Sequence, residues 1–479
     1  MKINPFDKLR VNPSIFKVYD IRGVYPGEIN EEVARLLGRV LARFFRRVRK
    51  VAPRPSLRLK LRRARQARGL TSVVGYDVRL SSKSLESALV NGLREAGVDV
   101  VWLGMVPTPV VSFAVLQLKA DFGVVVSASH SPGEVNGFKI IDAWANQIGW
   151  QKGLERIAGL IAKSKNQKSK RGRHGTVNPI NIIPRYAAFL IKRFHGKIRP
   201  MRILADYGNG VGATTAEKIF KNLEIKTKAL FPRPDGRFPN HNPNPHDPRN
   251  FKWIQSELKR GDYDLGIFFD GDADRAVFFD HRGNFIRPDI IAGIFALDIL
   301  KRHRGAEIYH DLRFSKAVIE EIKKAGGKAI KMPVGNPYYK GKIPERKSAW
   351  LGAELSGHIM FRDFWGIDDG FYSALKLMAI MSKAKKPLAV LALPFRRYAQ
   401  SGEISIAVKN PSRALRKIAT RFLGGKRSRL DGLTIEYPEW WFNIRPSHTE
   451  PVLRLNVEAR DPKNLRQAVR RLSKLLRRP

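Results

Sequence analysis

The sequence contains no cysteine, which excludes disulfide bonds, thiolate metal ligands and a cysteine nucleophile. It also lacks an apolar run close to the ~20 residues that a membrane-spanning helix needs. In the longest candidate, 290–300, Asp298 interrupts the pattern. Residues 1–10 alternate charged and apolar side chains and have no apolar centre typical of a signal peptide. These absences predict a cytoplasmic protein without a membrane segment.

Acidic residues are scarce, because 43 Asp and Glu stand against 89 Lys and Arg, a formal net charge of +46. Such a surplus attracts polyanions, including nucleic acid. The excess is spread along the chain, however, and a general basic bias of the surface is the favoured interpretation. The most basic stretch, 46–68, contains no aromatic side chain for base stacking. We interpret it as an insertion between a helix and a strand, and we expect no functional nucleic-acid partner.

A chain of 479 residues is too long for one core and predicts about three or four domains. Apolar residues recur at helical spacing over 33–45, with Asn30 as a candidate N-cap. Farther on, apolar strands such as 122–127 and 265–269 alternate with helices, which indicates α/β units with mixed or parallel sheets. We predict three similar α/β domains and a C-terminal α+β domain, with bounds at 1–160, 176–280, 281–394 and 395–479.

The first chemical motif lies after the apolar strand 122–127, where a turn of small residues would expose Ser129. Open α/β sheets carry their sites at the C-terminal ends of strands. A serine becomes a nucleophile only with help from a base or a cation, and His130 and Lys139 are nearby candidates. An ordinary turn is the alternative, and the Gly-x-Ser-x-Gly elbow of an esterase is absent.

The second motif places Asp270, Asp272 and Asp274 at alternate positions after another apolar strand. Three such carboxylates can converge on one hard divalent cation, Mg²⁺ first, and a solvated acidic turn is the alternative. An EF-hand is excluded because its sixth position would be Arg275 and its twelfth His281. The loop therefore predicts a metal site.

Two further motifs can bind the parts of a phosphorylated ligand. Arg445 and the hydroxyls that follow it, in a turn over 445–451, suit a phosphate. Glu354, Ser356 and His358 alternate and could project to one side of a strand. For both segments an ordinary polar turn or strand end is the alternative. The run 206–212 has the wrong spacing for a dinucleotide loop and predicts a tight strand-to-helix turn.

Taken together and in this order, the four motifs resemble those of the α-D-phosphohexomutases. The segments 16–23, 75–81 and 136–139 match as well and point to the phosphomannomutase/phosphoglucomutase branch. The resemblance covers nearly the whole chain except 46–68. It implies four domains around a central cleft, each contributing one motif.

The resemblance also implies a reaction and its residues. Phosphorylated Ser129 would interconvert hexose 1-phosphate and hexose 6-phosphate, of mannose, glucose or both, through a hexose 1,6-bisphosphate. One Mg²⁺ per chain would be held by Ser129, Asp270, Asp272 and Asp274, and the bisphosphate would act as an activator. Arg22 would assist at the phosphate, and His130 or Lys139 would move the proton. The implied substrate-binding residues are Tyr19, Arg275, Lys340, Glu354, Ser356, His358, Arg445, Ser447, His448 and Thr449.

Several positions depart from the family pattern. Ser131 and His448 stand where Asn is usual, and Ala353 stands where Gly is common. Residues 335–340 (GNPYYK) replace a segment that commonly begins Gly-His or Gly-Trp, which leaves the choice of mannose, glucose or glucosamine open. A phosphoglucosamine mutase, a metal-dependent phosphatase with an aspartate nucleophile, and a polyanion-binding protein on a mutase fold are the alternatives. We expect sugar phosphates as the partners, no membrane, and a monomer or a dimer.

Overall fold

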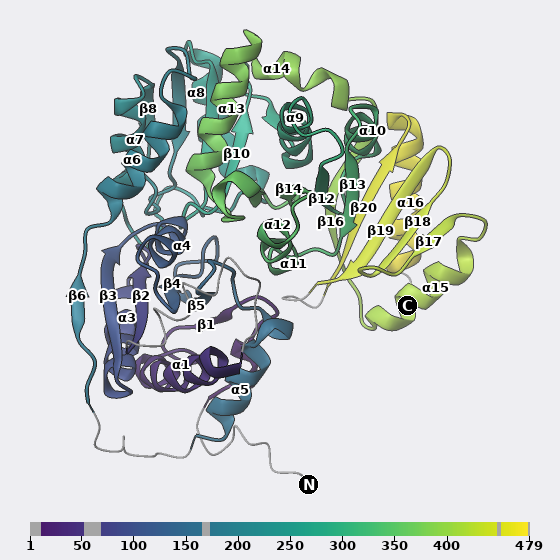
Figure 1. The fold of residues 1–479 in the computed structure, drawn as a ribbon. Coiled ribbons are helices and arrows are strands. Elements are labelled where there is room, and N and C mark those ends of the chain that lie inside the picture. The colour runs from purple at the N-terminus through teal and green to yellow at the C-terminus, as the bar shows by residue number, and fades with distance from the viewer. Residues whose placement is uncertain (1–10, 52–68, 165–172, 448–451, 478–479) are drawn as a thin grey trace. The chain divides into compact units, whose positions relative to one another are not determined.

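The computed structural model describes residues 11–51, 69–164, 173–447 and 452–477, and Figure 1 follows the chain through them. The chain forms two compact units. Unit 1 contains Met1–Phe285 and Ser356–Pro387, and unit 2 contains Ile286–Leu355 and Leu388–Pro479. Most of the basic stretch 46–68, much of the polar linker over 163–175, and the predicted ligands His448 and Thr449 lie outside the described residues.

The first sheet of unit 1 has six strands. They are β1 (Ile21–Val24), β2 (Leu70–Tyr76), β3 (Val98–Met105), β4 (Phe122–Val126), β5 (Val135–Asp142) and β6 (Val177–Pro179). Their order is β1-β5-β4-β2-β3-β6, with β2 parallel to β3 and β4, and β5 antiparallel to β4 and β1. The predicted mixed sheet is confirmed. Because β2 and β4 are parallel neighbours, the loops that follow Tyr76 and Val126 meet at one edge.

In the described part of the chain, four helices accompany the first sheet. They are α1 (Glu31–Val51), α3 (Ser82–Glu95), α4 (Thr108–Gln117) and α5 (Leu154–Ala162). Asn30 caps α1, since its Oδ1 accepts a hydrogen bond from the Val33 amide at 3.1 Å. Helices α1 and α3 approach closely at two glycines. A Cβ on Gly38 would lie 2.4 Å from the Leu89 oxygen, and one on Gly92 would lie 2.0 Å from the Arg35 oxygen.

Helix α1 extends beyond the apolar pattern that predicted it. The stretch 46–51 was assigned to the basic insertion, but it continues the helix. Arg46 donates to the Ala96 carbonyl at the end of α3, Arg49 lies 3.7 Å from Asp121, and Val48 packs against the hydrophobic core. Arginine has a high helix propensity, and these contacts give its side chains partners on neighbouring elements. Helix α1 therefore continues to Val51, the last described residue before 69.

The second sheet of unit 1 has five strands. They are β7 (Arg202–Asp206), β8 (Lys226–Leu230), β9 (Leu265–Phe269), β10 (Ala276–Phe279) and β11 (Phe285–Ile286), in the order β11-β10-β9-β7-β8. Unit 1 also contains β15 (Ile359–Phe361), which is not a strand of this sheet. The helices that accompany the second sheet are α6 (Ile183–Phe194), α7 (Ala213–Asn222), α8 (Lys252–Arg260) and α13 (Gly370–Ala384). Phe251, Phe268 and Phe279 lie in its core. The antiparallel pair β9 and β10 flanks the acidic loop.

Unit 2 begins with parallel strands. These are β12 (Glu307–Asp311), β13 (Lys328–Met332) and β14 (Ala349–Ala353), and β12 lies between the other two. The helices of this part are α9 (Pro288–Leu300), α10 (Lys316–Lys324), α11 (Pro337–Lys340), α12 (Lys342–Glu345) and α14 (Leu388–Leu391). Helix α9 has apolar side chains on nearly every face and is almost completely buried, as expected of a helix inside a core.

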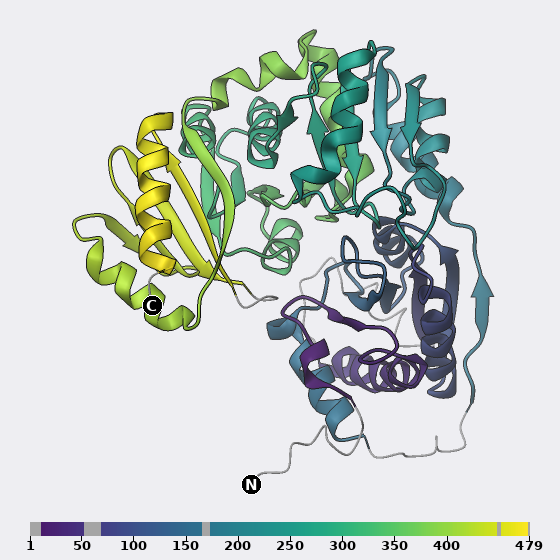
Figure 2. The same cartoon turned by 180° about the vertical axis from the view of Figure 1, so that it is seen from behind.

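The C-terminal part of unit 2 is an antiparallel sheet with helices. Its strands are β16 (Ala399–Ala407), β17 (Lys426–Ser428), β18 (Leu433–Glu436), β19 (Trp440–Pro446) and β20 (Val452–Ala459), in the order β16-β20-β19-β18-β17. Helices α15 (Pro411–Arg421) and α16 (Pro462–Arg477) complete it. Figure 2 shows α16 lying over one face of this sheet, and Ile418, Leu455 and Leu472 share its core. The predicted α+β module is confirmed.

Short elements connect these layers. Single 3-10 turns lie at Pro13–Ile15 (η1), Trp150–Lys152 (η3), Pro248–Phe251 (η4), Arg362–Phe364 (η5) and Leu393–Phe395 (η6). The run 206–212 is a tight turn between β7 and α7, as predicted. Among the described residues, no helix combines the length and the apolar character needed to cross a bilayer.

Candidate active site

Ser129 lies in the loop that follows β4, at the edge where β2 also ends. Its backbone is left-handed, with φ at +53°, and its side chain is buried. A non-glycine residue in this region costs about 1–3 kcal/mol and persists only where its surroundings hold it. One such contact is local, since the Ser129 amide donates to Ser127 Oγ at 2.9 Å. The loop therefore presents the serine in one fixed backbone conformation.

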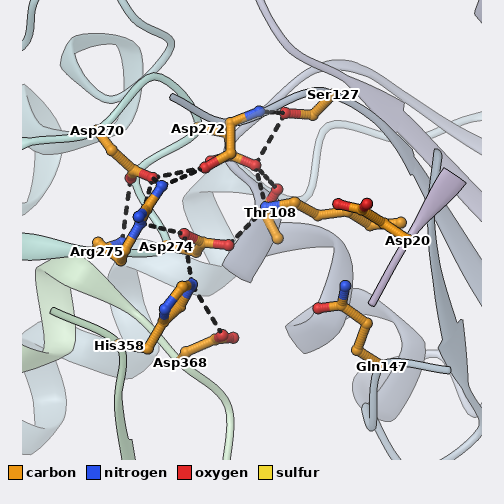
Figure 3. A network of polar contacts seen from close by, with 12 residues as sticks. Asp20, Thr108, Ser127, Gln147, Asp270, Asp272, Asp274, Arg275, His358 and Asp368 are labelled. Carbon is orange, nitrogen blue, oxygen red and sulfur yellow. Dashed lines mark hydrogen bonds and ion pairs between the residues drawn. The ribbon is translucent and has the colours of Figure 1, made fainter. Parts of the chain in front are cut away.

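The acidic loop between β9 and β10 faces this serine from the second sheet of unit 1. One ligand oxygen from each of Asp270, Asp272 and Asp274 lies within 4.8 Å of the others, and all three residues are buried. Ser129 Oγ donates to Asp270 Oδ2 at 2.8 Å. Figure 3 shows the three carboxylates pointing toward one another beside Arg275. The structure thus brings together all four of the predicted metal-binding residues.

Two cations partly balance these carboxylates. Lys139 Nζ lies 2.6 Å from both Asp272 Oδ2 and Asp274 Oδ2. Arg275 donates from Nε to Asp270 Oδ2 at 2.7 Å and from Nη2 to Ser129 Oγ at 2.6 Å. Burial alone would lower the pKa of Lys139, but Asp272 and Asp274 raise it above its ordinary value. The ammonium group therefore stays charged in this arrangement.

The remaining electrostatics fit a divalent cation. Burial raises the pKa of Asp270 to about 7, because the attraction of Arg275 does not offset burial and the neighbouring carboxylates. Among the described residues, the buried oxygen Asp272 Oδ1 has no hydrogen-bond partner, and Asp274 Oδ1 has only ion-pair contacts, with His358 Nε2 at 3.5 Å and Arg275 Nε at 3.6 Å. Buried carboxylate oxygens without partners are costly, and oxygen ligands of this kind suit Mg²⁺. The residues present therefore fit a hard divalent cation.

His130 and Arg22 both have contacts with the serine loop. His130 Nδ1 lies 3.3 Å from Ser129 Oγ and also contacts Arg275 Nη2. Burial, and then the charge of Arg275, lowers the pKa of His130, so a neutral imidazole is favoured there. Arg22 donates to Ser131 Oγ at 2.9 Å and pairs with Asp20 at 2.6 Å.

Unit 2 carries the predicted phosphate-binding arginine. Arg445 lies in β19, and its Nη2 donates to Glu403 Oε2 at 3.0 Å. The same oxygen accepts from Arg313 Nη1 at 2.7 Å, and Arg313 also pairs with Asp311. Two guanidinium groups thus share one carboxylate. Ser447 follows β19, and its amide donates to the Val452 carbonyl at 2.9 Å.

Comparison with known proteins identifies the family. Four family models match consecutive parts of the chain. They describe phosphoglucomutase/phosphomannomutase alpha/beta/alpha domains I, II and III, over residues 59–168, 184–283 and 287–398, and the C-terminal domain, over residues 403–475. The chain belongs to the phosphoglucomutase/phosphomannomutase family. The α-D-phosphohexomutase resemblance is thereby confirmed.

Full-length relatives within this family support the assignment. The chain is 35% identical to the phosphomannomutase of Methanocaldococcus jannaschii, over 96% of this chain and 97% of that protein. It is 35% identical to the phosphomannomutase/phosphoglucomutase of Pseudomonas aeruginosa, over 93% and 92%. A crystal structure of a phosphoglucomutase/phosphomannomutase family protein from Burkholderia thailandensis aligns with a TM-score of 0.83 and 31% identity, covering 97% of both chains.

The sugar-loop prediction needs a correction. Glu354, Ser356 and His358 do not alternate along a strand, because 354–358 is a turn between β14 and β15, with Gly357 at φ +94°. In unit 2, Glu354 Oε1 accepts from the Gly335 amide at 2.6 Å. In unit 1, His358 Nε2 lies 3.5 Å from Asp274 Oδ1. The glycine permits the turn, across which Ser356 Oγ lies 2.8 Å from His358 Nδ1.

Other predicted residues are located without a direct test of their roles. Lys340 ends α11 and is buried. Tyr19 is half-buried, and its carbonyl accepts from Gln147 Nε2 at 3.0 Å. His358 also lies 3.9 Å from Asp368, the partner that Figure 3 shows beside it. Substrate binding by Tyr19, Lys340 and His358 stays a prediction.

Sequence reasoning missed several contacts of this site. Thr108, the first residue of α4, donates to Asp272 Oδ2 at 2.5 Å, and Ser127 donates to the same oxygen at 2.9 Å. Arg79 follows β2 and donates to the Ser131 carbonyl of the serine loop at 2.6 Å, and Asp77 accepts from the Arg79 amide. Only the match of 75–81 to the family pattern pointed to this loop, and it suggested no role. Nothing local in the sequence indicates that Thr108 contacts Asp272.

Proposed function

We propose that this chain is a phosphohexomutase that interconverts hexose 1-phosphate and hexose 6-phosphate through phosphorylated Ser129. Family membership makes it an isomerase of sugar phosphates. The observation that supports the serine route is the position of Ser129 Oγ, 2.8 Å from Asp270 and 2.6 Å from Arg275 at a cluster of three buried carboxylates. An aspartate-nucleophile phosphatase gives this serine no role.

In the first half-reaction the ester bond between Ser129 Oγ and phosphorus breaks, and a bond forms from phosphorus to a hexose hydroxyl oxygen. The hydroxyl proton passes to a nearby base, for which His130, with its lowered pKa, is the candidate. The product is a hexose 1,6-bisphosphate. The base returns the proton to Ser129 Oγ as this oxygen leaves phosphorus. In the second half-reaction the other phosphoryl group transfers to Ser129 Oγ, whose proton passes through the base to the hexose oxygen that the group leaves.

The side chains around the transferring group supply charge and position. Phosphoryl transfer depends chiefly on alignment and on stabilisation of the charged oxygens. Arg275 already donates to Ser129 Oγ. Arg22 donates to Ser131, which lies in the same loop as Ser129. Asp270, Asp272 and Asp274 would hold one Mg²⁺, which neutralises negative charge on the phosphate when bound. Lys139 pairs with Asp272 and Asp274 and offsets the repulsion between these two carboxylates.

The far end of the substrate belongs to unit 2. Arg445, Ser447, His448 and Thr449 are proposed to hold the phosphate that does not react, and Glu354 the sugar hydroxyls. Arg445 is side-chain buried at 8% exposure and paired with Glu403, so a phosphate must compete with that carboxylate. Residues 335–340, which depart from the family pattern, flank Glu354 through the Gly335 contact. Mannose and glucose phosphates are the proposed substrates, and glucosamine phosphate is the main alternative.

The test is phosphate mapping combined with a coupled mutase assay. Wild-type protein incubated with Mg²⁺ and glucose 1,6-bisphosphate should carry one phosphate at Ser129, and the bisphosphate should raise activity with mannose 1-phosphate or glucose 1-phosphate. Ser129→Ala should lose the label and most turnover while still binding hexose phosphate. A label on Asp270 with an active Ser129→Ala variant would instead favour the phosphatase. Glucosamine 1-phosphate as the only substrate would reassign the sugar.

A further inference from the structure

Arg79 is a buried arginine three residues after the end of β2. Its side chain is 0% exposed, so it cannot touch a substrate. A guanidinium group has five N–H donors, and here all five have an acceptor. Nε donates to Asp77 Oδ2 at 3.1 Å. The other four donors reach backbone carbonyls of one short segment, 129–135.

That segment is the second part of the serine loop, which runs from Ser127 to Glu134, together with the first residue of β5. Arg79 Nη2 donates to the carbonyls of Ser129, at 3.0 Å, and Ser131, at 2.6 Å. Nη1 donates to the Val135 carbonyl at 2.7 Å and also contacts the Pro132 carbonyl. These four oxygens come from a segment whose first residue, Ser129, has a left-handed backbone. One side chain therefore ties the strained residue to the start of β5.

Asp77 and Phe238 fix the position of the Arg79 side chain. Asp77 Oδ1 accepts from the Arg79 amide at 3.0 Å and from Ser82 Oγ at 2.6 Å, which fixes the carboxylate to the start of α3. On the far side, the guanidinium lies over the Phe238 ring at 5.3 Å. The guanidinium fork is planar and rigid, so these contacts fix its direction as well as its place.

We propose that Arg79 is a positioning residue for phosphoryl transfer, which holds the backbone of Ser129 so that Oγ lies between Asp270 and Arg275. The inference rests on the proposed serine route. Without the four donors, the buried carbonyls lose their partners and the loop can leave the left-handed conformation. Oγ would then move away from the acidic loop although every residue that contacts the substrate is still present.

A lysine at this position separates positioning from charge. Arg79→Lys keeps the positive charge beside Asp77, but an ammonium group has three donors and cannot reach four carbonyls in a fork. Because a displacement of about 1 Å can cost about 10²-fold in rate, kcat and the rate of Ser129 phosphorylation should fall by about that factor. KM for hexose phosphate should stay within about twofold of wild type, because the residues that bind the substrate are unchanged.

Chemical rescue adds a readout that a merely structural role would not move. In Arg79→Ala, methylguanidinium far below denaturing concentrations should restore part of the phosphorylation rate, whereas methylammonium should not. Arg193→Lys is the matched control, since Arg193 pairs with Asp363 at 2.6 Å in unit 1 away from the serine loop. It should lower the unfolding temperature without changing kcat. If Arg79→Lys does not fold, Asp77→Asn gives a milder version with a smaller loss in kcat.

The outcomes separate this inference from the proposed function. A wild-type chain that never labels Ser129 removes the serine route and the inference with it. A wild-type chain that labels Ser129, together with a folded Arg79→Lys variant of unchanged kcat, removes the inference alone. A proportional rise in KM with unchanged kcat, or an equal effect of Arg193→Lys, would show that Arg79 only supports the fold.

Discussion

The two oxygens of Asp272 have different surroundings. Oδ2 accepts from Thr108, Ser127 and Lys139, which come from α4, the serine loop and β5. Oδ1 has no hydrogen-bond partner among the described residues. Three donors on one oxygen fix the carboxylate plane and leave the second oxygen for a metal ion. Residues behind a ligand set its direction in this way in many metal sites.

Thr108→Val should therefore weaken the metal site without touching a ligand. The substitution keeps the side-chain shape and removes the donor at 2.5 Å from Asp272. Loss of an outer partner costs about 10–100-fold in metal affinity or activity, so we expect the Mg²⁺ concentration for half-maximal activity to rise by about that factor. Titration of activity with Mg²⁺, and direct Mn²⁺ binding, measure this.

Two further variants calibrate the result. Thr108→Ser retains the hydroxyl and should behave like wild type. Asp272→Asn removes charge from the ligand itself and should weaken metal binding and transfer more strongly than Thr108→Val. Full activity of the chelated wild-type protein would contradict the three-carboxylate site, and an unchanged Mg²⁺ requirement of Thr108→Val would contradict the role of its hydroxyl.

At the scale of elements, α3 contains a carboxyl group buried against the first sheet. Glu86 is 3% exposed, and its Oε1 has no hydrogen-bond partner among the described residues. Burial raises the pKa of Glu86 to about 7, although hydrogen bonds from Trp102 and Ser87 oppose the shift. The folded protein therefore binds a proton that the unfolded chain, with an ordinary glutamate pKa near 4.5, releases earlier.

This difference predicts how stability changes with pH. Since the folded-state pKa is the higher one, the contribution of Glu86 is complete below about pH 4.5 and is lost as pH rises toward 7. Glu86→Gln, which is neutral throughout, should remove this part of the decline between about pH 4.5 and 7. Urea unfolding at several pH values measures it. Glu217→Gln, on the exposed face of α7, is the control, and identical pH profiles of wild type and Glu86→Gln would refute the prediction.

Elements with a strong local pattern were predictable from the sequence. Strand β4 and helix α3 follow from apolar runs of the right period, and the acidic loop after β9 follows from its alternating carboxylates. The turn at 354–358 was not predictable from alternation, since one left-handed glycine decides it. The contacts of Arg79 were hidden as well. They join residues about fifty positions apart, which only the pairing of β2 with β4 brings together.

At the scale of the molecule, the predicted residues divide between the two units. Ser129 and the three aspartates lie in unit 1, whereas Glu354 and Arg445 lie in unit 2. The boundary falls between Leu355 and Ser356, inside the predicted sugar loop. The proposed reaction needs both groups of residues, because one phosphate reacts at Ser129 while Arg445 is proposed to hold the other phosphate. The central cleft that the family resemblance implies stays a prediction.

Charge is the other property of the whole molecule. Helix α16 illustrates the excess, since its 16 residues include no Asp or Glu and its exposed cations recur at helical spacing. Four of these exposed cations are Lys463, Arg466, Arg470 and Lys474. The segment 52–68 likewise contains seven Lys and Arg and no acidic residue. If the net charge of +46 reflects a basic bias spread over the whole surface, helix α16 and the segment 52–68 should contribute equally to polyanion binding.

The basic segment should be dispensable for catalysis. It joins the end of α1 to the start of β2, and none of the site residues comes from it. Replacing 52–68 by a neutral Gly/Ser segment of equal length keeps the cost of loop closure nearly constant. We expect unchanged kcat and KM for hexose phosphate. Lower activity of the folded replacement would show that this segment contributes to the site.

Matched removal of charge then distinguishes a bias from a nucleic-acid site. One variant changes four cations of α16 to Gln, and the other changes Arg58, Arg62, Arg63 and Arg65. On duplex DNA each contact with a phosphate contributes about −0.9 to the slope of log K against log salt. A distributed bias predicts similar and modest slope changes for both variants, well below the limit of about 3.6 for four contacts. If only the change within 52–68 abolished binding, the segment would be a specific polyanion site, because local geometry and not total charge would then decide affinity.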